Sequence, residues 1–160
     1  MKNRRLDDKV VSDCGISRKK ADRITLENDD LEVLRTENVI EFQTYRRAVY
    51  KGILFTTRDY DENKAKCNSL IEFLHQGRKH LGEIICVVKT SDKTLCLVET
   101  FKIVHEKMIF HRVSMQKVNH LRPVRKSNVK VLVEFSSILT KVFKVGDYIA
   151  VLPNEFERSL

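Results

Sequence analysis

From Val39 onward, the chain is a succession of short runs rich in Val, Ile, Phe, Tyr and Thr, separated by Gly, Asn, Asp and Ser. β-branched and aromatic residues favour strands, and the separating residues favour turns. No long helical segment lies between the runs, so the crossovers that parallel strands require are missing and the strands should be antiparallel. The predicted strands are 39–49, 53–57, 69–74, 81–88, 95–104, 108–113, 129–135, 138–145 and 148–152.

The same pattern predicts how the sheet closes. About 120 residues are available for eight or nine strands, several of them long, and this suits a small barrel better than a large sandwich. Gly52 can adopt the positive φ that a tight hairpin needs between the first two strands. We therefore predict an all-β fold: a small, mostly antiparallel, strongly bent barrel of the SH3-like kind with an appended hairpin. Its largely buried residues should be Ile84, Cys86, Val88, Leu97, Val131, Val133, Ile149 and Val151.

Residues 1–37 have a different composition. They carry nine Lys or Arg and nine Asp or Glu, with only scattered apolar residues, which is too few to build a core. At most one helix is expected there, over residues 17–35, with Ile24, Leu31 and Leu34 sharing part of one face. The sequence thus predicts a flexible charged tail over 1–37, partly helical at most, and one β-barrel domain over 38–158.

The positive charge of the chain belongs to the predicted domain. The net charge is +8, yet residues 38–160 alone carry 21 Lys or Arg against 13 Asp or Glu, so the tail contributes none of the excess. A positive domain attracts polyanions such as nucleic acid or an acidic protein tail through its long-range field. A basic surface also keeps a domain soluble without any ligand. Charge therefore narrows the class of partner but does not choose one.

The chain lacks the usual signatures of metal binding and catalysis. Its four cysteines and five histidines include no Cys-x-x-Cys or His-x3-His pair of the kind that aims two ligands at one zinc ion. Cys67 has no local nucleophile signature, and the isolated glycines build no phosphate-binding loop. We expect no enzyme activity, no metal and no cofactor. The polar amino end and the absence of a long apolar stretch predict an intracellular protein with reduced thiols and no membrane span.

Basic residues next to aromatic ones are more informative. Nucleic-acid grooves on small barrels combine phosphate-neutralising cations with planar rings that stack on bases. Segment 45–51 has two tyrosines among three cations, and segment 120–126 reads as a basic loop within a stretch, 107–133, that contains no acid. Solvated charge runs are the commoner meaning of such segments. The residues expected to contact nucleic acid are Arg46, Arg47, Lys51, Arg122, Arg125 and Lys126.

A second kind of site is suggested by four aromatic residues. Rings gathered at a barrel mouth can hold a methylated lysine by cation–π attraction, with a nearby acid such as Asp59 or Asp61. Aromatic residues at strand spacing are more often part of the core, and both interpretations stay open at this point. The candidate pocket consists of Tyr50, Phe55, Tyr60 and Phe73.

Several short motifs follow one another in an order that is informative as a whole. They are Tyr50-Lys51-Gly52 followed by Phe55-Thr56-Thr57, Asn68-Ser69, Leu81-Gly82-Glu83-Ile84, Lys141-Val142, and Tyr148-Ile149-Ala150-Val151-Leu152-Pro153-Asn154 followed by Phe156-Glu157. Over about residues 40–158 this order resembles the carboxy-terminal tail module of proteins derived from animal DNA transposons, which in turn is similar to the BAH (bromo-adjacent homology) barrels of chromatin proteins. The resemblance implies a BAH-like fold, a chromatin or DNA setting and a nuclear location.

Taken together, these features favour a non-enzymatic binding module. Its expected partner is nucleic acid, or else an acidic or methyl-lysine protein tail. One alternative is a small enzyme or metal-binding domain that uses Cys67, Cys86 or Cys96 with a histidine. Another is a folded fragment without a selected role.

Overall fold

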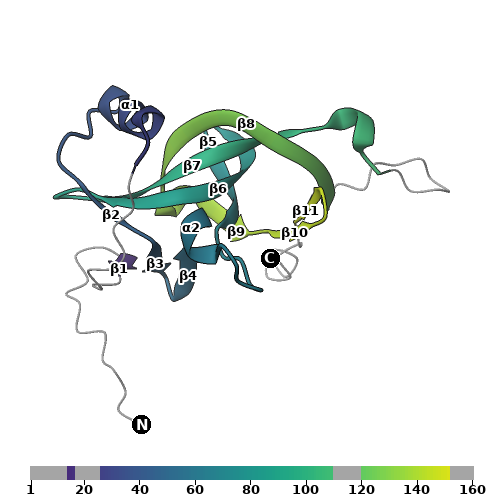
Figure 1. The fold of residues 1–160 in the computed structure, drawn as a ribbon, viewed down its shortest axis with the longest axis horizontal. Coiled ribbons are helices and arrows are strands. Elements are labelled where there is room, and N and C mark those ends of the chain that lie inside the picture. Colours follow the sequence, from purple (N-terminus) through teal and green to yellow (C-terminus); the bar gives the residue numbers. More distant parts are fainter. Residues whose placement is uncertain (1–13, 17–25, 110–119, 152–160) are drawn as a thin grey trace, which may run out of the picture.

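The structure of the chain is a computed structural model, which describes residues 14–16, 26–109 and 120–151 (Figure 1). Several predictions fall outside these residues: the tail over 1–13 and 17–25, most of the predicted strand 108–113, and the end of the domain after residue 151. The helices are α1 (Asn28–Thr36), α2 (Arg58–Asp61) and the 3-10 turns η2 (His105–Lys107) and η3 (Phe135–Ser137). The strands are β1 (Cys14–Ile16), β2 (Gln43–Tyr45), β3 (Arg47–Tyr50), β4 (Ile53–Thr56), β5 (Leu70–His75), β6 (Arg78–Lys89), β7 (Thr94–Ile103), β8 (Leu121–Glu134), β9 (Ile138–Lys141), β10 (Phe143–Val145) and β11 (Tyr148–Ala150).

These strands form two sheets. The larger sheet has the order β10-β11-β8-β7-β6-β5-β9, with β2 added to β6, and the smaller one has the order β1-β3-β4. Their pairings are antiparallel, and the large sheet curls strongly into a half-barrel (Figure 1). The turn between β3 and β4 has Lys51 at φ 48° and Gly52 at φ 77°, as expected for a tight hairpin. The predicted all-β, mostly antiparallel and strongly bent fold is confirmed.

One bent segment joins the two ends of the curled sheet. The predicted strand 138–145 is divided into β9, which pairs with β5, and β10, which pairs with β11. Only Val142 separates the two, and its N–H still donates to the carbonyl of Leu70 in β5 at 3.0 Å. Residues 138–145 thus form both the first and the last strand of the sheet order, and we call this segment the seam strand.

The curl has identifiable local causes. The strand register shifts at Glu72/Phe73, between β6 and β7 near Ile84, and between β7 and β8 near Thr100, and such bulges bend and twist a strand. Gly82 permits close packing at one bend. A Cβ atom built on Gly82 would lie 2.5 Å from a methyl carbon of Val98 and 2.8 Å from a backbone oxygen, so no larger residue fits without rearrangement.

Both faces of the sheet are covered by apolar contacts. One cluster of buried side chains lies between the sheet and the β3–β4 hairpin, a second lies under α1, and a third lies where β5 and β11 approach each other. Double coverage explains the continuous apolar runs of the sequence, since central strands then have no solvated face. Of the eight residues expected in the core, Val131 and Val151 are only partly buried, and the other six are fully buried.

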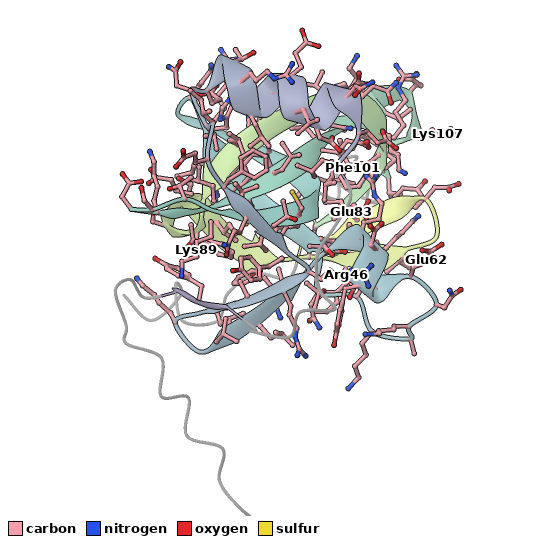
Figure 2. The ribbon with its side chains drawn as sticks, turned by 60° about the vertical axis from the view of Figure 1, so that its left-hand side comes forward. Arg46, Glu62, Glu83, Lys89, Phe101 and Lys107 are labelled. Carbon is pink, nitrogen blue, oxygen red and sulfur yellow. The ribbon has the colours of Figure 1, made fainter. Side chains whose placement is uncertain are left out.

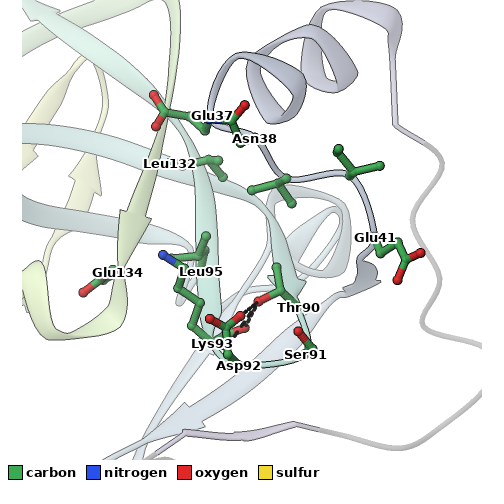
Figure 3. A pocket seen from close by; sticks show the side chains of 12 residues that line it. Glu37, Asn38, Glu41, Thr90, Ser91, Asp92, Lys93, Leu95, Leu132 and Glu134 are labelled. Atoms are coloured by element: carbon green, nitrogen blue, oxygen red, sulfur yellow. Dashed lines mark hydrogen bonds between the residues drawn. The ribbon is translucent and has the colours of Figure 1, made fainter.

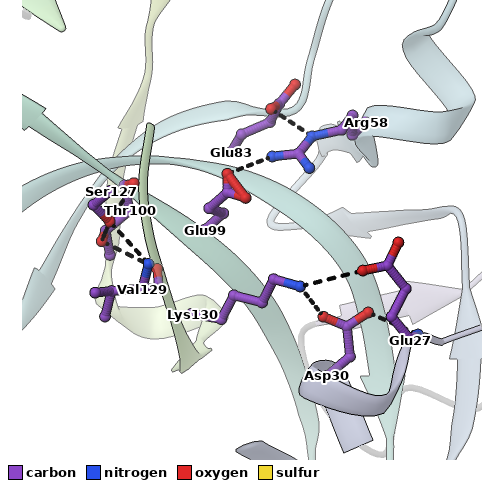
Figure 4. A network of polar contacts seen from close by, with 9 residues as sticks. All are labelled: Glu27, Asp30, Arg58, Glu83, Glu99, Thr100, Ser127, Val129 and Lys130. Carbon is purple, nitrogen blue, oxygen red and sulfur yellow. Dashed lines mark hydrogen bonds and ion pairs between the residues drawn. The ribbon is translucent and has the colours of Figure 1, made fainter. Parts of the chain in front are cut away.

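Helix α1 packs on the face of β6 and β7 opposite to the one that the β3–β4 hairpin covers. It begins with a capping box, in which the Glu27 N–H donates to the Asp30 carboxylate. Leu34 is completely buried against β6 and β7, and Lys130 of β8 forms an ion pair with Asp30 (Figure 4). Packed structure therefore begins before the boundary predicted at residue 38, because α1 supplies the apolar cover for this face.

Two local predictions were wrong. Residues 121–126 are not a loop but the first half of β8. Pro123 is accommodated there because only its N–H is missing, and its carbonyl still accepts from the Val104 N–H at 2.9 Å. The predicted strand 39–49 is shorter than expected, since residues 39–42 connect α1 to β2. Within the described ranges, no helix is long and apolar enough to cross a membrane.

Candidate nucleic-acid interface

The structure separates the two predicted basic segments. Tyr45 of β2 lies opposite Val87, which lies opposite Cys96 near the start of β7, whereas Arg125 lies opposite Lys102 near the end of β7. Six residues of an extended strand span about 20 Å. Arg46 and Arg125 therefore lie toward opposite ends of the sheet. Figure 2 likewise places Lys89, at the β2 end of the sheet, and Lys107, near the far end, on opposite sides of the domain.

The segment around Arg46 is less exposed than a surface hairpin would be. Arg46 and Arg47 are both partly buried, and the Nε atom of each lies out of contact with solvent. The guanidinium of Arg47 lies 5.7 Å from the centre of the Tyr60 ring. Lys51 is exposed at the tip of the β3–β4 hairpin, with its ammonium 5.4 Å from the Tyr50 ring centre. Of these three residues, only Lys51 is fully exposed.

Arg122 faces the interior of the barrel. Its Nη1 lies 3.5 Å from Oε2 of Glu72, a carboxylate on β5 whose side chain is only 7% exposed. Arg122 lies opposite Ile149, a core residue, so both side chains point to the same inner face. Arg122 therefore neutralises a buried acid, which makes it unsuitable as a surface phosphate ligand.

Arg125 lies on the outer face, directly opposite another cation. It pairs in register with Lys102 of β7, so the two side chains leave the same face about 5 Å apart. Both are exposed, and the neighbouring Lys126 is exposed as well. The side chains of Lys102 and Arg125 have no hydrogen bond or ion pair to any other residue in the described part of the chain. We call Lys102 and Arg125 the cation pair.

A side-chain network fixes the strands next to the cation pair. Three residues of β8 oppose the single residue Thr100 of β7, and Asn128 takes a left-handed conformation with φ 62°. The Thr100 and Ser127 hydroxyl oxygens are 2.6 Å apart, and the Ser127 hydroxyl also donates to the Thr100 carbonyl at 2.8 Å and accepts from the Val129 N–H at 3.1 Å (Figure 4). This bulge turns the strands at the point from which the cation pair projects.

A second like-charge pair in the same sheet shows how such a pair is normally compensated. Glu83 of β6 lies directly opposite Glu99 of β7. Arg58 of α2 bridges them, with Nε 2.7 Å from Glu83 and Nη2 3.1 Å from Glu99 (Figure 4). Burial alone would lower the pKa of Arg58, but the hydrogen bonds and charges of the two glutamates raise it above its ordinary value. The acidic pair has its own counter-ion, whereas the cation pair has none among the described side chains.

The predicted aromatic pocket is wrong for two of its four residues. Phe55 and Phe73 are core residues, and Phe55 packs edge-on against Phe135 with ring centres 5.6 Å apart. Tyr50 packs against the same Phe135 ring, with ring centres 5.6 Å apart. The ammonium of Lys64 lies 3.1 Å from the centre of the Tyr60 ring, so a cation of the same chain already occupies this ring. Strand alternation turned the two phenylalanines inward, so no open cage for a methylated lysine forms from this set.

The end of the sheet opposite the cation pair carries an acidic groove. It has a volume of about 680 Å³ and lies between the α1–β2 connection and the β6–β7 turn (Figure 3). Glu37, Glu41, Asp92 and Glu134 line it, against the single cation Lys93. A surface of this sign repels phosphates. The long axis of the sheet therefore runs from an acidic end to a basic end.

The cysteines offer little chemistry in this environment. Burial, followed by the charges of Asp30 and Asp59, raises the pKa of Cys86 to about 12, so its thiol stays protonated at neutral pH. Partial burial and the charge of Asp61 also raise the pKa of the exposed Cys67. Across the ranges that the structure describes, no three His, Cys, Asp or Glu side chains gather in a way that could hold a metal ion.

Sequence reasoning did not select Lys102. The only local signal is its position between Phe101 and Ile103 in a predicted strand, where alternation puts a lysine on the exposed face. Its pairing with Arg125 depends on the β7–β8 register, which the bulge at Thr100 shifts. No family model matches this chain, and comparison with curated proteins and with solved structures found none that is similar to it. The resemblance to transposon-derived tail modules stays a prediction.

Proposed function

We propose that this domain is a non-enzymatic module that binds the phosphate backbone of nucleic acid through the cation pair. The observation that carries this proposal is the register of Lys102 opposite Arg125 on an exposed face. Like charges placed directly opposite each other destabilise a sheet. A bound anion relieves that cost, as Arg58 does for the acidic pair with the opposite sign.

The surroundings favour a polyanion over a single small anion. No acidic residue occurs between positions 107 and 133, so the strand that carries Arg125 and Lys126 adds no local repulsion. The acidic groove at the other end of the sheet would orient the domain with its basic end toward a phosphate chain. A nucleic-acid ligand also agrees with the chromatin setting and nuclear location that the resemblance implies.

The test is a fluorescence anisotropy titration of a labelled oligonucleotide at several salt concentrations. Wild type is compared with the double reversal K102E/R125E and with K89E/K93E, which makes the same change of charge at the opposite end of the sheet. Each neutralised phosphate of duplex DNA contributes about 0.9 to the logarithmic salt slope, so K102E/R125E should lower the slope by about 1.8 and weaken binding. K89E/K93E should keep the slope close to that of wild type.

Two results would contradict the proposal. One is equal loss of affinity in both double variants, which would mean that net charge and not position determines binding. The other is equally tight binding of a poly-glutamate peptide of matched charge, which would make an acidic protein tail the better partner. Thermal unfolding of all three proteins checks that the exposed substitutions leave the fold intact.

A further inference from the structure

Beside the cation pair, the same face continues as a strip of apolar and aromatic side chains, of which those on β10 are exposed, Tyr148 is half-buried and Pro123 is buried. Phe143 is 49% exposed and Val145 is 56% exposed, both on the short strand β10. In register, Val145 lies opposite Tyr148 of β11, and Tyr148 lies opposite Pro123 of β8. Large apolar side chains on an outer strand are a liability for a soluble domain unless they have a partner.

Register places this strip and the cation pair on the same face. Paired residues of neighbouring strands share a face, as do residues two apart on one strand, so the face runs from Tyr148 through Pro123 to Arg125. The residues between them, Val124 and Ile149, point the other way into the core. With strands about 4.8 Å apart and a rise of about 3.3 Å per residue, Tyr148 lies about 8 Å from Arg125, and Phe143 lies about 8 Å from Tyr148.

One ring of the strip is held in place. The Tyr148 hydroxyl donates to the carbonyl of Lys107 at 3.2 Å, which ties β11 to the 3-10 turn η2 and fixes the orientation of the phenol ring. Phe143, which is 49% exposed, lies on the neighbouring strand β10. Aromatic rings near exposed cations are the two elements that single-stranded nucleic acids require, stacking platforms for bases and positive charge for phosphates.

We infer that the preferred ligand of this face is a single-stranded nucleic acid, with bases on Phe143 and Tyr148 and the backbone on the cation pair. This inference rests on the proposed function and specifies its substrate class. Duplex nucleic acid keeps its bases stacked inside the helix, so it can use Lys102 and Arg125 but gains nothing from Phe143. Stacking and charge therefore make separable contributions to affinity.

The experiment measures anisotropy with three labelled probes of equal phosphate number: an oligo-dT strand, an oligo-U strand and a DNA duplex. Wild type is compared with F143A, with F143L, which keeps apolar volume but loses the ring, and with L139A, a control at an exposed leucine on the other half of the seam strand. F143A and F143L should weaken single-strand binding by about 5- to 100-fold, the range for one stacked base, and change duplex binding less than about twofold. L139A should behave like wild type.

The salt dependence supplies a second readout. F143A should leave the salt slope for the single strands unchanged because the ring carries no charge, whereas K102E/R125E should flatten it. Preference for either single strand over the duplex supports the inference, and the ratio of the two shows whether the 2′-hydroxyl contributes.

Three outcomes separate this inference from the proposed function. Duplex binding as tight as single-strand binding, with no effect of F143A, overturns the inference and leaves the backbone-binding function standing. No binding to any probe overturns both. A wild-type dimer in solution that F143A converts to a monomer would mean that a second copy covers the strip, and this also overturns the inference.

Discussion

Removing the side chain of Leu34 tests whether α1 is part of the cooperative domain. Leu34 is completely buried between α1 and strands β6 and β7. Truncation of a buried leucine to alanine costs about 2 to 5 kcal/mol, through lost burial and the cavity left behind. With a urea dependence of about 2 kcal/mol per molar, a loss of 3 kcal/mol moves the unfolding midpoint down by about 1.5 M.

The assay is equilibrium urea unfolding followed by far-UV circular dichroism and by tyrosine fluorescence. The control is Ile40→Ala, which removes an apolar side chain just beyond α1 that is 83% exposed, and which should change stability by less than about 0.5 kcal/mol. A cost below about 1 kcal/mol for Leu34→Ala would refute the reasoning. We expect a chain shortened to begin at Asn38 to lose more stability than Leu34→Ala does. Unfolding of this shortened chain at the same urea concentration as the full chain would also refute the reasoning.

Three further predictions concern the core, the charged network and the thiols. Ile149→Ala should cost about 2 to 4 kcal/mol in thermal or urea unfolding, and a cost below about 1 kcal/mol would contradict the burial of β11. Arg58→Met should cost about 1 to 3 kcal/mol because it leaves two facing glutamates without a counter-ion, and a smaller cost is expected when one of them is changed to glutamine. Cys67 should react with a thiol reagent in the folded protein, and the rate should keep rising at alkaline pH because the pKa of this thiol is raised. Buried Cys86 should react only after unfolding, and equal rates for the two cysteines in the native state would contradict the packing described.

Most of the fold could be predicted from the strand pattern because the sequence signals for strands and turns are local. Runs of β-branched and aromatic residues around Val87 and Val133 form central strands in the structure, and Gly52 occupies the turn position that requires positive φ. Because the apolar periodicity before residue 38 is weak, the sequence predicted a flexible tail where the structure has the packed helix α1. Helix propensity and moment do not reveal that one residue, Leu34, fits against an apolar sheet face formed by residues 50 or more positions later in the chain.

The candidate site was harder to predict because it depends on strand register. Arg122 and Arg125 are three residues apart in one basic segment, yet one neutralises buried Glu72 and the other faces solvent. A one-residue change of register reverses such an assignment, and the bulge opposite Thr100 introduces that kind of shift. Lys102 became relevant only when its partner across the ladder was known.

The seam strand also has a consequence for how the domain folds and opens. Its pairing of Ile71 with Lys141 joins positions far apart in sequence, whereas neighbouring strands such as β6 and β7 meet through a short turn. Contacts of long sequence separation carry the larger loop-closure entropy, so we expect the meander of β5 to β8 to form early and the seam to close last. Local opening should then start at Val142. Because β10 stays paired with β11, and β11 with the strand β8 that carries Arg125, opening of the seam would leave the stacking strip beside the cation pair, and hydrogen exchange at β9 should report how often the seam opens.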